Sequence, residues 1–408
     1  GGAGDDVINN NTWVNEIATG GNVNGALTAM VADKAFVEGG GGNDTIQFIL
    51  SGATWGSSTI QGSQGNDVVI FDNNAGSTAQ NSQFLMGGGN DAFSGDMQAV
   101  TAITIAGGGG DDSVTFTSQG VTHQSLITLD TFNVASDWDG NDVFSGNAVG
   151  NYSSVTIQAG GGNDFISFSG NNDQGSNLYQ GNAGNDTIVL ESLSASTVQA
   201  GAGTDRVLID QDALGASIIQ LGGGNDELVM SAGMGLTATN LGASVSIYGG
   251  DGADLLFSGN TLSAGLTMGG VFSYSSYGQS TLSAMDTIAV TGGSGQIFNF
   301  RQDNGGLSLA SQGSTADGFT ATNGVIQFSA SYDNNITSRY EAVDGALTTV
   351  GTVATFVDGS DNIFLFVQGG DSDTLVQVGS TTLSAASTQS TGLGVTLGGG
   401  NTTIQLTT

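Results

Sequence analysis

Residues 39–48 read Gly39-Gly40-Gly41-Gly42-Asn43-Asp44-Thr45-Ile46-Gln47-Phe48, a glycine-rich turn that leads into an alternating hydrophobic strand. The same phrase, in which a glycine stands two residues before an aspartate, occurs in eleven copies. The aspartates of these copies are Asp6, Asp44, Asp67, Asp91, Asp112, Asp142, Asp164, Asp186, Asp205, Asp226 and Asp254. From the second of these aspartates to the last, one copy returns about every 23 residues. Internal repetition with such a period is typical of solenoids, in which each repeat forms one coil.

The positions around the aspartate show what each coil requires. Two residues before it there is always a glycine, so the backbone there takes a positive φ or approaches a neighbouring strand closely. Two residues after it the side chain is always apolar, as at Ile46, Val69 and Leu256, which predicts an inward-facing strand position. Apolar residues also stand seven or eight places before most of the aspartates. Each repeat therefore predicts a strand, a glycine turn, a second strand and a looser closing turn.

These patterns predict an all-β fold. We expect a right-handed parallel β-roll or β-helix solenoid of about eleven coils over residues 1–262, followed by a C-terminal β-rich cap over residues 263–408. After residue 262 the motif fades, and residues 283–288 keep the strand but lose the glycines. A distinct cap is required because the open end of a solenoid exposes an edge strand that aggregates. The spacing leaves open whether each coil has two faces or three.

Irregular spacing marks three segments as excursions from the coil: Asn9 to Glu38, Gly120 to Asp130 and Ser231 to Ala243. The first is either a longer coil or an inserted surface loop. The second contains His123, the only histidine of the chain. We expect that lone histidine in a polar loop to be a surface residue.

The repeated aspartate carries the functional information. Stacked coils place these carboxylates in a column about 4.8 Å apart, where unit charges repel by roughly 1 kcal/mol per pair in water. Such a column needs counter-charge, and carboxylates beside the free carbonyls of a glycine loop form the all-oxygen surroundings that calcium prefers. Magnesium is less suited because it requires strict octahedral geometry. The alternative is that these are plain solenoid turns without metal, since Asp and Asn favour turns for backbone reasons alone.

The phrase G-G-x-G-x-D-x-apolar-x resembles the calcium-binding nonapeptide of the repeats-in-toxin (RTX) family, whose members leave bacteria by type I secretion. Residues 39–48, 107–116 and 249–257 match it well. The resemblance implies calcium ions between coils, held by the eleven aspartates and by backbone carbonyls of the preceding loops. The loop glycines that it assigns to the metal sites are Gly40, Gly42, Gly108, Gly110, Gly160, Gly162, Gly222, Gly224, Gly250 and Gly252. Only one turn per coil carries the motif here, so we expect one calcium ladder on one edge.

The C-terminal part also resembles the tail of RTX secretion substrates. Aromatic strands there precede a G-G-x-x-D turn that runs from Gly369 to Asp373. In that family such a tail caps the roll and accompanies an uncleaved export signal. A mere β cap is compatible with the same pattern.

Composition narrows the function classes. The chain of 408 residues has 37 acidic and 4 basic side chains, for a formal net charge of −33, so it cannot neutralise the phosphates of a nucleic acid. It has no cysteine, hence neither disulfides nor thiolate metal sites. No apolar stretch is long enough to span a membrane, and no signal peptide is visible in this segment. We expect the chain, which opens inside a motif, to be part of a longer protein.

Three functions follow as hypotheses. The first is an extracellular, calcium-stabilised structural protein that self-assembles into a bacterial surface layer, sheath or filament. The second is an adhesin or other binding module whose excursions contact a ligand such as a cell-surface polysaccharide. The third is the non-catalytic part of a secreted RTX enzyme or toxin. No catalytic site is expected, since one histidine excludes H-E-x-x-H and no G-x-S-x-G elbow occurs. Aspartates are too numerous to single out a glycosidase pair.

Overall fold

The chain is described by a computed structural model at residues 3–4, 7–9, 27–28, 31–51, 54–74, 78–97, 99–116, 121–130, 140–147, 152–169, 175–230, 235–236, 245–257, 261–262, 271–289, 297–300, 306–311, 318–329, 331–360, 362–380, 394–398 and 403–407. These residues form strands almost throughout, with one short helix. The chain divides into two compact units, Gly1–Ala202 and Gly203–Thr408. The all-β solenoid expected from the sequence is confirmed in its parallel stacking.

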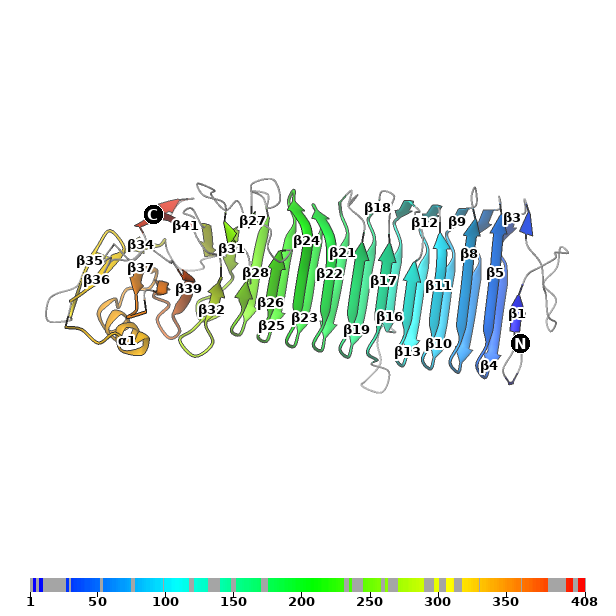
Figure 1. Cartoon of the computed structure of the whole chain (residues 1–408), viewed down its shortest axis with the longest axis horizontal. Helices are drawn as coiled ribbons and strands as arrows, with labels where there is room; N and C mark the ends of the chain where they lie inside the picture. Colours follow the sequence, from blue (N-terminus) through cyan, green and yellow to red (C-terminus); the bar gives the residue numbers. More distant parts are fainter. Residues whose placement is uncertain are drawn as a thin grey trace. The chain divides into compact units, whose positions relative to one another are not determined.

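Two parallel sheets run along the N-terminal unit, and one strand of each belongs to every coil (Figure 1). The first sheet, here sheet A, contains β4 (Phe36–Gly41), β7 (Thr59–Gln64), β10 (Gln83–Gly88), β13 (Thr104–Gly109), β16 (Leu126–Asp130), β19 (Thr156–Gly161), β21 (Leu178–Ala183) and β23 (Thr197–Ala202). The second, sheet B, contains β1 (Val7–Asn9), β5 (Thr45–Ser51), β8 (Val68–Asn74), β11 (Ala92–Met97), β14 (Ser113–Phe116), β17 (Val143–Asn147), β20 (Phe165–Ser169) and β22 (Thr187–Ser194). The short β2 (Leu27–Thr28) also pairs with β5.

The register brings equivalent motif positions together. Ile46 pairs with Val69, and Val69 with Phe93, so the apolar residues two places after the aspartates stack in one line. Their side chains are buried from the second copy to the last. The apolar residues before the glycine turn, such as Ile60 and Phe84, are buried opposite them. The inward-facing positions predicted from the repeat are therefore confirmed.

A third, short sheet completes the coils of the N-terminal unit. It contains β3 (Val31–Asp33), β6 (Thr54–Gly56), β9 (Thr78–Gln80), β12 (Ala99–Thr101), β15 (Val121–His123) and β18 (Tyr152–Ser153). The looser turn expected between copies is thus a strand followed by a sharp corner. A non-glycine residue with φ between 46° and 61° forms that corner in eight successive coils: Lys34, Ser57, Asn81, Ala102, Gln124, Ser154, Ser176 and Ala195.

One expected excursion proves to be ordinary coil. Residues 121–130 form β15 and β16, which pair in register with the strands of both neighbouring coils. The expectation that Gly120 to Asp130 forms an insertion is therefore wrong, because the extra residues of this coil lie at 131–139, outside the described residues. His123 is the last residue of β15. The Asn9 to Glu38 excursion pairs with the next coil at residues 27–28 and again from residue 31, whereas residues 10–26 are outside the described part.

The C-terminal unit begins with the same parallel arrangement. One sheet stacks β24 (Arg206–Leu214), β26 (Glu227–Met230), β29 (Leu255–Leu256) and β32 (Asp286–Ile288). The other stacks β25 (Ile218–Gly223), β28 (Ser246–Asp251), β31 (Val271–Tyr274) and β33 (Ile297–Phe300). The described part of the Ser231 to Ala243 excursion is β27 (Gly235–Leu236), which pairs with β30 (Thr261–Leu262) of the next coil.

Antiparallel strands end the stacking in this unit. β39 (Thr374–Ser380) pairs in parallel with β32 and antiparallel with β38 (Asn362–Val367), which continues to β37 (Thr352–Val357). Around β37 lie β34 (Ser308–Leu309), β36 (Val325–Phe328) and β35 (Phe319–Thr322). The hairpin β40 (Gly394–Gly398) and β41 (Thr403–Thr407) covers β33. Both sheets of the unit thus end on antiparallel strands, and the cap boundary at residue 262 stays a prediction.

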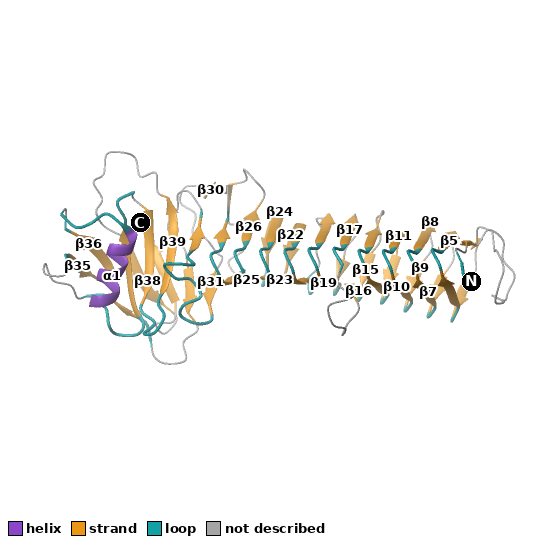
Figure 2. Cartoon of the chain, turned by 90° about the horizontal axis from the view of Figure 1, so that it is seen from below, coloured by secondary structure: helices purple, strands orange, loops and turns teal. Residues whose placement is uncertain are grey.

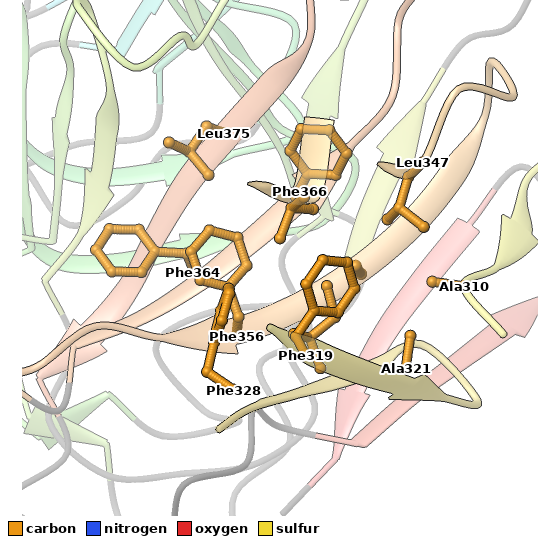
Figure 3. Close-up of a cluster of buried hydrophobic side chains, with 12 residues drawn as sticks. Ala310, Phe319, Ala321, Phe328, Leu347, Phe356, Phe364, Phe366 and Leu375 are labelled. Atoms are coloured by element: carbon orange, nitrogen blue, oxygen red, sulfur yellow. The ribbon is translucent and has the colours of Figure 1, made fainter. Parts of the chain in front are cut away.

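Helix α1 (Ile336–Ala346) packs against the antiparallel sheet (Figure 2). Asn335 caps its first turn by accepting the Thr337 N–H at 2.8 Å. Beneath it lies an apolar cluster in which the Phe356 and Phe364 rings stack at 5.5 Å (Figure 3). Arg339 donates from the helix to the carbonyl oxygens of Asp333 and Val357. None of the helices in the described part of the chain has the length and apolar character that a membrane crossing needs.

The solenoid amounts to about eight turns, slightly fewer than the eleven coils expected from the motif count. The motif copy at Asp6 adjoins residues outside the described part.

The glycine two places before Asp186 is required for both reasons expected from the sequence. Gly184 has a φ of 124°, a conformation that costs other residues about 1–3 kcal/mol. A Cβ at this position would also overlap the carbonyl oxygen of Gly162 in the preceding coil. Successive turns are thus in backbone contact, and no side chain fits between them.

We expect Gly184→Ala to lower the free energy of unfolding by about 1–3 kcal/mol from backbone strain alone. The overlap with Gly162 adds to this loss. The matched control is Gly223→Ala, because a Cβ on Gly223 meets nothing within 4 Å. Urea unfolding followed by circular dichroism measures both variants, and equal stabilities would contradict the close approach of the turns.

Candidate metal centre

The motif aspartates stand where the glycine turn enters the sheet B strand. Asp44, Asp67, Asp91, Asp112, Asp142, Asp164, Asp186, Asp205, Asp226 and Asp254 are each at most 3% exposed. Ten carboxyl groups are therefore inside the turns and not on the surface of the solenoid. The eleventh, Asp6, lies outside the described residues.

One oxygen of most of these carboxyl groups accepts a hydrogen bond from the preceding coil. The backbone N–H of Asp44 donates to Asp67 Oδ1 at 2.7 Å, and the same bond recurs at 2.7–2.8 Å in every step down to Asp186. In the C-terminal unit the bonds from Asp205, Asp226 and Asp254 to the next coil measure 2.8, 3.0 and 3.1 Å. Each unit therefore contains a continuous aspartate ladder, formed by these N–H to Oδ1 bonds.

A second ladder runs beside the first in the opposite direction. The residue before the aspartate, usually asparagine, accepts through Oδ1 the N–H of the equivalent residue in the following coil. Asn43 accepts from Asn66 at 2.8 Å and Asn66 from Asn90 at 2.9 Å. The series continues through Asp111, Asn141, Asn163 and Asn185. The sequence contained this signal in the repeated Asn-Asp pair, but its role becomes visible only when the coils are stacked.

In seven of these aspartates the second carboxyl oxygen, Oδ2, accepts no hydrogen bond. The Oδ2 atoms of Asp67, Asp91, Asp112, Asp142, Asp164, Asp226 and Asp254 are buried without a hydrogen-bond partner. Buried acceptors in native proteins are almost always satisfied, and an unsatisfied one costs about 1–3 kcal/mol. The repetition of one unsatisfied atom in coil after coil therefore points to a partner that is not part of the polypeptide.

The surroundings of Oδ2 show what that partner must be. A Cβ placed on Gly62 would meet both Asp67 Oδ2 and the carbonyl oxygen of Met86 in the next coil. At Gly107 it would meet Asp112 Oδ2 and the Leu129 carbonyl oxygen in the same way. Carboxylate and main-chain oxygens thus converge on a small volume that glycine keeps open. This donor set fits a hard cation with oxygen ligands.

Burial is the main influence on the acidity of the column. It raises the pKa of Asp112 and Asp164 to about 8, and that of Asp91, Asp142 and Asp226 to about 7. The N–H bond from the preceding aspartate lowers each pKa, while the charges of neighbouring carboxylates raise it. Without a cation, the folded column therefore takes up protons near neutral pH.

Two carboxylates outside the motif add to the columns, one in each unit. Asp286 continues the ladder by accepting the Asp254 N–H, and its Oδ2 accepts the buried Tyr274 hydroxyl at 2.9 Å. Asp130 lies beside the N-terminal column, where its charge raises the pKa of Asp112, Asp142 and Asp164. Sequence reasoning noted the strand at Asp286 but set it aside because the glycines were missing.

The carboxylates stack in a line and do not converge. Among the described residues, no three or more Asp, Glu, His or Cys side chains form a group that could hold a metal ion by themselves. A cation in the turns must therefore draw on backbone carbonyls as well as carboxylates. The ten loop glycines assigned above all have φ between 109° and 134°, and their ligation through carbonyl oxygens stays a prediction.

Comparison with known proteins agrees with this geometry. The family model of the RTX calcium-binding nonapeptide repeat (4 copies) matches residues 36–47, 53–73, 172–191 and 244–260. These matches include the turns that end at Asp44, Asp67, Asp186 and Asp254. A search of curated proteins found no matching sequence. RTX nonapeptide repeats bind calcium, and the buried aspartate ladder is consistent with that property.

The raised pKa values predict how stability depends on pH when calcium is removed. Below about pH 4 the carboxyl groups are protonated in both the folded and the unfolded chain. Between about pH 4 and 8 the unfolded chain ionises while the folded column resists, since Asp112 and Asp164 have pKa values of about 8. We therefore expect the melting temperature in EDTA to fall as pH rises from 5 to 8.

In calcium we expect the melting temperature to rise from pH 5 to pH 8 instead, because protons compete with the metal for the same carboxylates. Thermal unfolding at pH 5 and pH 8, with calcium and with EDTA, measures both effects. Repeating the EDTA series in 0.5 M NaCl separates the buried column from surface repulsion, which salt screens. A melting temperature in EDTA that rises toward pH 8 would contradict the buried column.

Substitutions at Asp164 distinguish a hydrogen-bond ladder from a metal ladder. Asp164→Asn keeps an Oδ1 acceptor for the Asp142 N–H but removes the charge. We expect it to match or exceed wild-type stability in EDTA at pH 8 and to gain less from calcium. Asp164→Ala also removes the acceptor, so it should lose about 1–3 kcal/mol in both conditions. Calcium stabilisation of the Asn variant equal to that of wild type would show that this carboxylate is not a ligand.

Proposed function

Because the chain belongs to the RTX β-roll proteins, we propose that it is a secreted structural protein that self-assembles outside the bacterial cell into a surface layer, sheath or filament. Calcium is the ion that the turns take up. The single observation that carries the calcium part is the buried Oδ2 atom that recurs without a partner from coil to coil. A cell-surface polysaccharide is the proposed anchor of the assembly.

The aspartate ladder supports a folding mechanism that suits secretion. Where calcium is scarce, ionised carboxylates repel one another and resist burial, so the repeats stay largely unfolded and can pass through an export channel. Where calcium is abundant, the ion offsets the charge of the column, and its binding energy becomes folding energy. Because each coil contacts only its neighbours, folding then propagates along the solenoid.

The outer surface of the coils supports assembly between copies. Register keeps equivalent side chains in columns, as in the glutamine ladder of Gln158, Gln180 and Gln199, whose amides bond at 2.6 Å. Such repetitive faces present the same chemistry at each step, which favours regular lateral contacts. The adhesin alternative depended partly on Gly120 to Asp130 as a binding loop. Most of that segment forms strands β15 and β16, so this support for an adhesin is lost.

The test is a calcium titration of EDTA-stripped protein, followed by far-ultraviolet circular dichroism and light scattering, with magnesium as the control. We expect a cooperative gain of β signal in calcium alone, because the oxygen donors of the turns do not provide strict octahedral geometry. A parallel rise in scattering, with ordered sheets or filaments in negative stain, is expected for a self-assembling protein.

Two outcomes would argue against the proposal in different ways. Full β signal in EDTA at neutral pH would mean that the glycine–aspartate turns fold without metal. Calcium-dependent folding that leaves monomers at every concentration would keep the calcium mechanism and remove self-assembly.

A further inference from the structure

A cluster of oxygen-bearing side chains lies in the C-terminal unit, away from the repeats. It is formed by one face of α1 and by the turn between β38 and β39. Tyr340 and Asp344 stand four residues apart on α1 and therefore point to the same side. The turn contributes Gln368 and Asp373. Tyr340 fixes the helix over the turn, because its ring packs on Phe366 at 5.9 Å and its hydroxyl donates to Asp373 Oδ2 at 3.0 Å.

Two carboxyl groups face each other in this cluster. Asp373 is 6% exposed, and its carboxyl group lies within hydrogen-bonding reach of that of Asp344. The backbone N–H of Gly369 holds Asp373 Oδ1 at 2.9 Å, so the turn itself orients the group. Two carboxylate charges at such close range repel each other, and a cation between them would offset that repulsion.

The amide of Gln368 gives a second observation, independent of the carboxylate pair, that points to a bound cation. This side chain is 5% exposed, and its Nε2 donates to Asp344 Oδ1 at 3.2 Å. Its Oε1, the other polar atom of this amide group, is buried without a hydrogen-bond partner. A shared proton between the two carboxyl groups would leave this oxygen unsatisfied, whereas a cation beside them would accept it as a further ligand.

The nearest arginine on the helix does not supply the missing charge. The Arg339 guanidinium donates to the carbonyl oxygens of Asp333 and Val357 and to Asn334 Oδ1. It also lies 4.8 Å from the centre of the Phe328 ring, on the apolar cluster. Asp344, Asp373 and Gln368 offer carboxylate and amide oxygens, and such ligands suit a hard divalent cation better than zinc or copper.

We propose that Asp344, Asp373 and Gln368 bind one calcium ion in the cap, at a site separate from the aspartate ladder. The ion fastens α1 to the β38–β39 turn. Main-chain oxygens of the turn and water complete the six to eight ligands that calcium takes. Because the site uses no repeat residue, it binds calcium even if the repeats were to fold without metal.

The first experiment counts bound calcium per chain, by mass spectrometry of the metal after equilibrium dialysis of the full chain. Asp344→Asn keeps the size of the side chain and removes one ligand charge, and we expect it to bind one calcium fewer than wild type. The matched control is Glu341→Gln, which removes the same charge from an exposed position on the same helix. Circular dichroism verifies that both variants are folded.

A second variant tests the amide oxygen directly. Gln368→Glu adds a third carboxylate, so a calcium site predicts a larger stabilisation by calcium than in wild type. A proton-sharing pair predicts a variant that is less stable at neutral pH whether or not calcium is present. An unchanged calcium count in Asp344→Asn, or no additional stabilisation of Gln368→Glu by calcium, would overturn the proposal.

Discussion

The structure depends on the bond between the backbone N–H of one aspartate and Oδ1 of the next. This bond places a carboxyl group inside every turn, where it satisfies a main-chain donor that the strands do not reach. Burial of so many acids is costly in free energy, since a buried carboxylate needs a compensating charge or a proton. The solenoid therefore cannot be at once fully ionised, metal-free and stable. Its stability is tied to the composition of the solvent outside.

The two ladders also explain why the coils keep their register. The aspartates accept from the preceding coil and the asparagines accept from the following coil. A slip of one residue in any strand would break both series and would turn the apolar stack outward. The glycines keep successive coils closely spaced, because a side chain at these positions would hold neighbouring turns apart. Geometry and charge are thus set by the same few residues of each repeat.

The last described carboxylate of the C-terminal column has different hydrogen-bond partners from those before it. In the C-terminal unit the ladder stops at Asp286, where the Tyr274 hydroxyl satisfies the oxygen that is left unpaired in the coils before it. Ser280 joins the same region to β39, since it donates to the Leu375 carbonyl and accepts the Asp286 N–H. In seven of the repeats Oδ2 has no hydrogen-bond partner in the protein, whereas the last coil of the column supplies a hydroxyl group and is followed by antiparallel strands.

The sequence alone determined the period, the inward positions and the aspartates of the ladder, because each of these recurs in every copy and repetition makes a weak local signal strong. It did not reveal the third strand of the coil, whose corner is formed by Lys, Ser, Asn, Ala or Gln and so has no residue signature. It also misplaced the extra residues that precede the sixth copy, because the spacing of the motifs does not show where strand pairing resumes. The burial of the carboxylates, the counter-running asparagine ladder and the cluster of Asp344, Gln368 and Asp373 were decided by the tertiary structure. Each depends on atoms that lie about 20 or more residues apart in the chain and meet only when coils stack or α1 packs on the sheet.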